Sequence, residues 1–110
     1  MEQSTDRPIR VESDEALRDL LAAEPVVLLE VSTPGCGICA SMEPVLGNVA
    51  RGTDATVALV DATDAPSFTG DRDVVRAPTL FVFVDGEAVA RRDEGFVGAD
   101  ELLDWLAEHR

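Results

Sequence analysis

The sequence predicts an α/β fold with a central mixed β-sheet and helices on both faces. Strand-like and helix-like segments alternate along the 110 residues, and this alternation is typical of β-α-β units with parallel strands. Three strand segments are almost continuously apolar, which indicates that both faces of the sheet are covered. Asp85-Gly86 separates the last two strand segments and favours a hairpin, which adds an antiparallel pair. Residues 1–110 are expected to form a single domain.

The N-terminal part of the chain predicts a strand, a helix and a second strand. Residues 8–11 are a candidate for a short first strand. Ser13 is suited to cap a helix over residues 14–23, which has acidic residues in its first turn and apolar residues at helical spacing. Pro25 ends this helix, and the apolar segment 26–32 follows as a buried strand.

The remaining elements continue the alternation. A second helix is expected over residues 37–51, and Pro44 within it introduces a kink. The later elements are, in order, a strand over 56–60, a loop or short helix over 65–73, a strand over 79–84, a half-exposed antiparallel strand over 87–92 and a helix over 100–108.

The composition is strongly acidic. The formal net charge is −13, and all nine basic residues are arginine. A field of this sign repels nucleic acids and anionic membranes, so neither is expected as a partner. Abundant Asp and Glu without lysine resembles the proteins of salt-loving archaea, which indicates a halophilic source. A GC-rich genome would also remove lysine, but it explains the acid excess less well.

The chain is expected to act in the cytoplasm as a monomer. No apolar run approaches the roughly 18 residues of a membrane-spanning helix. The polar segment 1–11 lacks the apolar centre of a secretory signal. In a reducing compartment, two closely spaced cysteines are more typical of a redox or metal site than of a structural disulfide.

The two cysteines, Cys36 and Cys39, stand between a predicted strand and a predicted helix. In the first turn of a helix, residues i and i+3 share one face at roughly 5–6 Å, which lies within disulfide range. If Cys36 precedes that turn, its sulfur lies near unpaired N–H groups that stabilise a thiolate. Cys39 is then more shielded, while Gly35 and Gly37 leave room for a partner's disulfide to reach Cys36.

Other interpretations of the pair remain open at this point. A zinc site needs about four ligands, and the one histidine, His109, lies next to the C-terminus. A dimer that shares four thiolates would supply them. A third interpretation is that the two cysteines are unreactive and pack as small hydrophobic side chains.

With these features in place, the chain resembles the thioredoxin family over nearly its whole length. Five features at compatible spacing carry the resemblance: the motif Cys36-Gly37-Ile38-Cys39, a helix-kinking proline at Pro44, a cis-proline before a buried strand at Pro78-Thr79-Leu80, a hairpin at Asp85-Gly86 and a glycine before the last helix at Gly95. The resemblance implies the thioredoxin fold for the predicted mixed sheet.

The resemblance also implies a thiol–disulfide oxidoreductase that reduces protein disulfides. Cys36 would attack the substrate, Cys39 would release it, and a disulfide reductase or other thiol donor would restore the dithiol. Neither an organic cofactor nor a metal is implied, because the redox-active disulfide Cys36–Cys39 carries the electrons. The residues implied to contact the substrate are Gly35, Gly37, Ile38, Ala77, Pro78 and Gly95.

Glu30 interrupts the apolar strand six residues before Cys36, where the family usually has a buried aspartate. Burial would raise the pKa of this carboxyl. Glu30 would then accept the proton of Cys39 when that thiol attacks the mixed disulfide. The alternative is a strand glutamate turned to solvent.

The chain departs from the family pattern close to the cysteine pair. Gly35 stands where the family has tryptophan, Ile38 stands where it has proline, and the lysine expected near the buried carboxylate has no counterpart. These departures leave the substrate, the reduction potential and the reductant open. A non-catalytic module that binds a partner or senses its redox state is the main alternative, and a metal-bridged dimer is a second.

Several other conspicuous residues are expected to be structural. Met42 and Trp105 are expected to pack in the core, and His109 to be solvated at a frayed helix end. Arg91 and Arg92 are expected to form a small patch at a sheet edge, where charge discourages pairing with another chain.

Overall fold

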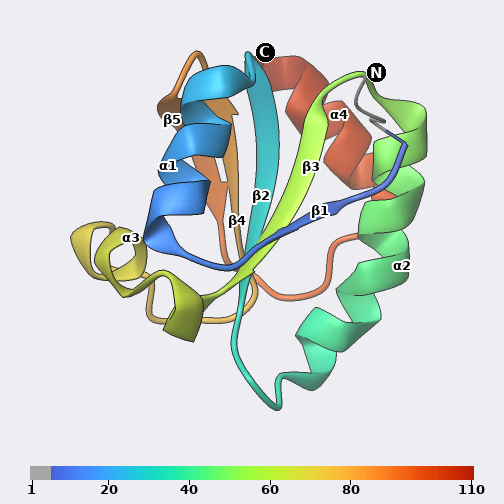
Figure 1. Ribbon diagram of the computed structural model, residues 1–110. Helices are drawn as coiled ribbons and strands as arrows, with labels where there is room; N and C mark the ends of the chain where they lie inside the picture. Colours follow the sequence, from blue (N-terminus) through green and yellow to red (C-terminus); the bar gives the residue numbers. More distant parts are fainter. Residues whose placement is uncertain (1–5) are drawn as a thin grey trace.

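The computed structural model describes residues 6–110, in which a five-stranded mixed sheet lies between two pairs of helices (Figure 1). The first five residues of the polar N-terminal segment, where no secretory signal is expected, lie outside the described part. The elements are, in order, β1 (Ile9–Val11), α1 (Asp14–Ala23), β2 (Val26–Ser32), α2 (Gly37–Gly52), β3 (Thr56–Asp61), the 3₁₀ turn η1 (Ala62–Asp64), α3 (Pro66–Asp71), β4 (Thr79–Val84), β5 (Glu87–Arg92) and α4 (Ala99–His109).

The sheet has the order β1-β3-β2-β4-β5. Strands β1, β3 and β2 are parallel, whereas β4 is antiparallel to β2 and β5 is antiparallel to β4. The predicted mixed sheet is therefore confirmed, with β2 at its centre. The register places Glu30 of β2 between Leu59 of β3 and Leu80 of β4.

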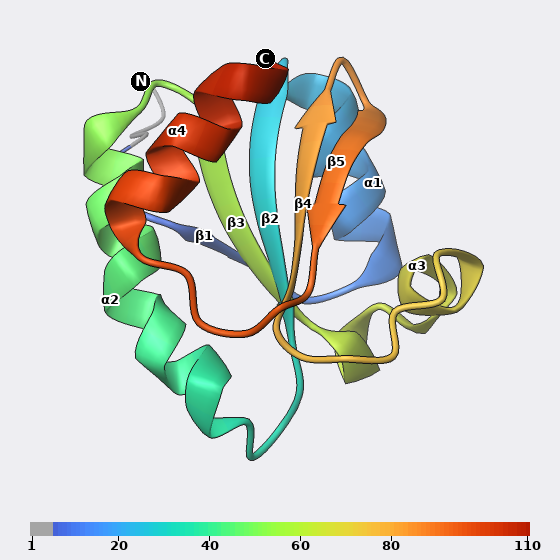
Figure 2. The ribbon, with the colours of Figure 1, turned by 180° about the vertical axis from the view of Figure 1, so that it is seen from behind.

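The helices cover opposite faces of the sheet, as the apolar strands predict. Helices α1 and α3 lie on one side and α2 and α4 on the other (Figures 1 and 2). The side chains of β4 alternate between the two cores: Phe81 and Phe83 pack with Phe68 of α3, and Leu80 and Val82 pack beneath α2 and α4. This alternation follows from the period of two along a strand.

Local sequence signals account for the ends of the elements. The side chain of Ser13 accepts a hydrogen bond from the N–H of Ala16 at 3.0 Å and caps α1, as predicted. The hairpin residues Asp85 and Gly86 both have positive φ values, 52° and 83°. Such values are typical of a tight two-residue hairpin and explain why glycine is favoured there.

Helix α4 extends further than the sequence predicts. It includes His109, whose ring packs edge-on against Trp105 with ring centroids 5.9 Å apart. The expected frayed, solvated His109 is therefore wrong, since this residue is helical and half-buried. Trp105 is half-buried and packs against the core beneath α2 and α4.

The ends of β2, β3 and β5 and the start of β4 lie at the same end of the sheet. Ser32 ends β2 opposite Asp61 at the end of β3, and Val31 pairs with Thr79 at the start of β4. Leu80 in turn pairs with Arg92 at the end of β5. The segments 33–36, 72–78 and 93–98 therefore all leave the sheet at this end (Figure 2).

Among residues 6–110, no helix has both the length and the apolar character that crossing a membrane would require.

Candidate active site

Cys36 is the N-cap of α2. It has an extended backbone, and its Sγ accepts a hydrogen bond from the N–H of Cys39 at 3.1 Å. Gly35 precedes it with a φ of 76°, a left-handed value that turns the chain from β2 into the helix. The sulfur therefore lies at the positive end of α2, as predicted. This position stabilises a thiolate whenever the pair is reduced.

The two cysteines form a disulfide, with Cα atoms 5.2 Å apart. Cys36 is half-buried, whereas Cys39 is only 5% exposed. The predicted separation and the predicted shielding of Cys39 are both confirmed. An incoming sulfur can reach Cys36 more readily than Cys39, and the backbone already holds both sulfurs at bonding distance.

Glu30 is fully buried, with 0% of its surface exposed. Within residues 6–110, neither of its carboxyl oxygens has a hydrogen-bond partner. The pKa of Glu30 is raised from 4.5 to about 7, chiefly by burial and also by the nearby Glu43, while Arg10 acts in the opposite direction. The predicted burial is confirmed, and the alternative of a solvent-facing glutamate is wrong. Near neutral pH this carboxyl can both hold and release a proton.

A cavity of about 410 Å³ connects Glu30 with the disulfide. Its lining includes Glu30, Cys36, Cys39, Gly35 and Gly37, which the sequence singles out, and also Arg10, Glu43 and Asp61. The disulfide and the buried carboxyl therefore line the same cavity.

Arg10 is a part of the site that the sequence does not reveal. In the sheet, Arg10 of β1 and Glu30 of β2 both pair with Leu59 of β3. The guanidinium of Arg10 lies 3.6 Å from the carboxylate of Glu43 on α2. Arginine from the edge strand thus supplies the basic group near Glu30, although the chain has no lysine. Only the strand order brings it there.

The charges of Arg10 and Glu43 are expected to set the proton affinity of Glu30 in opposite directions. Arg10→Gln removes an attractive charge and should raise the pKa of Glu30, whereas Glu43→Gln removes a repulsive charge and should lower it. The measurement is an NMR titration of the Glu30 side-chain carboxyl carbon in each variant. Glu15→Gln, an exposed change on α1, serves as the control. Shifts of the same sign in both variants would contradict the assignment.

The other predicted contact residues lie outside this cavity. The Ala77–Pro78 peptide bond is cis, as the resemblance implies. Pro78 is buried, Ala77 is half-buried, and Gly95 adopts a φ of 102° in the segment that leads to α4. Ile38 is 46% exposed at the start of α2. Ala77, Pro78 and Gly95 lie in segments that leave the sheet at the same end as Cys36, and Ile38 follows Cys36 in the first turn of α2.

The sequence alone does not single out two exposed apolar residues next to these positions. Val75 is 83% exposed and lies two residues before Ala77, and Phe96 is 56% exposed and follows Gly95. Their proximity to Ala77 and Gly95 is visible in the sequence, but their exposure depends on how the two loops are held.

The geometry defines a class of protein. Cys36 can form and break its bond to Cys39 while the backbone stays in place. A buried carboxyl with a pKa of about 7 shares the cavity with both sulfurs. These are the requirements of a dithiol–disulfide oxidoreductase.

Comparisons with known proteins identify the family. The family model described as Thioredoxin matches residues 8–108. A thioredoxin from Mycobacterium tuberculosis is 36% identical over 102 residues, covering 91% of this chain and 87% of that protein. A thioredoxin variant from Halobacterium salinarum has a structure that matches with a TM-score of 0.89 at 32% identity, covering 99% of this chain and 96% of that one. The chain belongs to the thioredoxin family and is a thiol–disulfide oxidoreductase.

One of the similar proteins is of a different kind. A protein disulfide-isomerase from Triticum aestivum is 31% identical over 114 residues, which cover 98% of this chain but 22% of that protein. The similarity therefore involves a small part of the larger protein, and its overall activity does not transfer to this chain.

Proposed function

We propose that the chain reduces disulfide bonds in other proteins through two successive thiol–disulfide exchanges. The Cys36 thiolate attacks one sulfur of a substrate disulfide, and the other sulfur leaves as a thiolate. Cys39 then attacks Cys36 and releases the second substrate thiolate, so that the substrate gains two electrons and Cys36–Cys39 becomes the disulfide. The observation that carries this proposal is the helix-capping sulfur of Cys36 within bonding distance of the shielded Cys39.

Glu30 is the proton acceptor in the second exchange. The Cys39 thiol must lose its proton before it attacks, and Glu30 lies in the same cavity with a pKa raised to about 7. A base of this pKa is well matched to neutral pH. Cys39 therefore passes its proton to Glu30 directly or through water in the cavity, and Glu30 later releases that proton to solvent.

The substrate is expected to lie across the loops around Cys36. The half-buried Ala77 before the cis-proline offers its backbone to an extended peptide, and Gly95 lets that peptide approach closely. The exposed Ile38 and Phe96 provide apolar contact. Such a surface suits a protein substrate better than a small polar disulfide.

Repeated turnover is the decisive experiment. With dithiothreitol as electron donor, the wild-type chain should reduce many equivalents of insulin, and Cys36→Ser should reduce none. A chain that is oxidised once and then stops would instead be a redox-sensing binding module. The reduction potential of the Cys36–Cys39 couple then shows whether the chain serves as a reductant or as an oxidant in the cell.

We infer that the chain acts as a monomer in a salt-rich cytoplasm, where a disulfide reductase or other thiol donor regenerates it. The support is the net charge of −13 without lysine, together with the structural similarity to a thioredoxin from Halobacterium salinarum. An acidic surface of this density repels itself at low ionic strength.

Stability is expected to rise with salt. At about 1 M salt the screening length falls to about 3 Å, which removes most of the repulsion among exposed carboxylates. The free energy of unfolding, measured by urea titration, should therefore increase from 0.1 M to 2 M KCl. A value that stays constant or falls over this range would contradict the halophilic assignment.

A further inference from the structure

The two consecutive arginines of β5 occupy opposite faces of the sheet. The guanidinium carbon of Arg91 lies 5.2 Å from the ring centroid of Phe81, and that of Arg92 lies 5.1 Å from the ring of Trp105. The Arg92 side chain is only 13% exposed. The predicted edge patch is therefore wrong for Arg92, because α4 and the segment before it cover this side chain.

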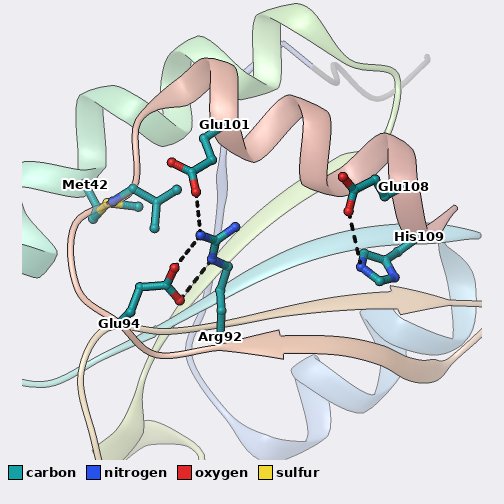
Figure 3. A network of polar contacts seen from close by, with 7 residues as sticks. Met42, Arg92, Glu94, Glu101, Glu108 and His109 are labelled. Atoms are coloured by element: carbon teal, nitrogen blue, oxygen red, sulfur yellow. Dashed lines mark hydrogen bonds and ion pairs between the residues drawn. The ribbon is translucent and has the colours of Figure 1, made fainter.

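Arg92 ties the segment 93–98 to α4. Its guanidinium donates hydrogen bonds to the carboxylate of Glu94, through Nε and Nη2, and to Oε2 of Glu101 at 2.8 Å. Figure 3 shows the guanidinium between these two carboxylates, which come from the loop and from the helix. Charge-assisted bonds of this kind are stronger than neutral ones, so Glu94 is held at the start of the loop.

The same segment is anchored again at its other end. The N–H of Val97 donates to Sδ of Met42 at 3.5 Å, and Val97 is buried. Met42 therefore links the loop to α2, in addition to its predicted role in the core. Gly95 and Phe96 lie between these two anchors, which explains how Phe96 can stay exposed in a loop of defined position.

Arg91 holds the segment 72–78 in a comparable way. Its guanidinium donates to the carbonyl oxygens of Arg72 and Asp73, the latter at 3.0 Å. Further along, the hydroxyl of Thr79 donates to the carbonyl of Arg76 at 2.6 Å. Val75 lies between these two fixed points and is exposed.

We propose that Arg91 and Arg92 are positioning residues that hold the segments 72–78 and 93–98, at the same end of the sheet as the cysteine pair, and thereby determine affinity for protein substrates. The proposal rests on the proposed function, because it assumes that Ala77, Gly95 and Phe96 contact the substrate. A loop that is already ordered loses less conformational freedom when a substrate binds. Without the arginines, binding of a protein disulfide weakens, while the chemistry at Cys36 is unchanged.

The first test follows the loops themselves by amide hydrogen exchange. Arg92→Gln is expected to speed exchange about tenfold in residues 94–97 and to leave residues 73–77 unchanged, and Arg91→Gln is expected to do the reverse. Arg92→Lys keeps the charge and should restore part of the protection. Arg51→Gln, which removes an exposed arginine bonded to Asn48, is the matched control and should affect neither loop.

The second test compares a large and a small substrate. For insulin, each of the two variants should raise KM about three- to tenfold with little change in kcat. For bis(2-hydroxyethyl) disulfide, which is too small to span the loops, the rate should change less than twofold. Thermal unfolding of each variant shows whether the fold is intact, and Glu101→Gln, a milder change at the same contact, should give a smaller increase in KM.

The outcomes separate this proposal from the proposed function. The proposal would be overturned if either variant lost the same share of activity with both substrates. It would also be overturned if either variant sped amide exchange in both loops. Each result would mean that the arginines only stabilise the fold. Exchange and kinetics like wild type in both variants would also overturn it. Absence of insulin turnover in the wild-type chain would contradict the proposed function, while the exchange experiment would still decide whether each arginine holds its loop.

Discussion

Replacement of Cys39 by serine is expected to stop turnover and to leave the chain covalently bonded to its substrate through Cys36. A serine hydroxyl does not ionise near neutral pH and cannot displace Cys36 from a mixed disulfide. The substitution keeps the backbone N–H that donates to the sulfur of Cys36. Cys36 therefore remains an activated nucleophile, and only the second exchange is lost. Turnover should fall by at least about a thousandfold, as for other residues that act as one unit.

The covalent complex is the measurement. Cys39→Ser is reduced, freed of reductant and mixed with insulin whose native disulfides are intact. The adduct is quantified by non-reducing electrophoresis and mass spectrometry, with release by dithiothreitol as the check. Cys36→Ser is the matched control, because it leaves Cys39, which is only 5% exposed. It should form at least about ten times less adduct, since thiol–disulfide exchange requires access to the attacking sulfur. Equal trapping by both variants would contradict the assignment of Cys36 as the attacking residue.

The order of the elements and the chemistry of the cysteine pair can be predicted from the sequence, because both depend on local patterns. Alternation in the segment 79–84 indicates a strand with two apolar faces, and the structure places Phe81 and Leu80 in separate cores. The position of Cys36 before an apolar-periodic segment predicts the helix cap that Sγ occupies. Each of these features involves residues that are close together along the chain.

The surroundings of the pair could not be predicted in the same way. Arg10 approaches Glu30 only because β1 and β2 flank β3, and no local pattern specifies that strand order. Arg91 and Arg92 are equivalent in the sequence, but α4 covers only Arg92. The burial of Glu30 is a different case, since the family resemblance and the apolar neighbours of Glu30 in the strand both predict it. Long-range packing therefore decides the electrostatics of the site.

Replacement of Glu30 by glutamine is expected to change how stability depends on pH. The pKa of Glu30 is about 7 in the folded chain, against a usual value of 4.5. Between these values the folded state keeps a proton that the unfolded state has released, so wild-type stability falls as pH rises. At about 1.4 kcal/mol for each tenfold change in proton affinity, the loss reaches about 3 kcal/mol above pH 7. Glu30→Gln has no such loss.

The measurement is the free energy of unfolding of the oxidised chain at several pH values from about 4 to 8.5. The free energy of unfolding of the variant, minus that of the wild type, should increase by about 3 kcal/mol across this range. Any cost of burying the amide without partners is the same at every pH and does not enter this change. Asp14, Asp54, Asp61 and Glu94, whose pKa values are lowered by hydrogen bonds, affect both proteins alike. A constant difference between the two proteins would show that Glu30 titrates normally.

The same variant separates a structural role of Glu30 from a role in proton transfer. If Glu30 accepts the proton of Cys39, Glu30→Gln should slow release of a trapped mixed disulfide by about 100-fold at pH 7, the lower end of the usual range for general bases. The difference should shrink toward pH 9, because a larger share of the Cys39 thiol then ionises without the help of Glu30. Glu15→Gln on α1 is the control and should match the wild type. Equal release rates from pH 6 to 9 would leave Glu30 as a buried carboxyl that affects stability alone, and the proton would then pass from Cys39 to water in the cavity.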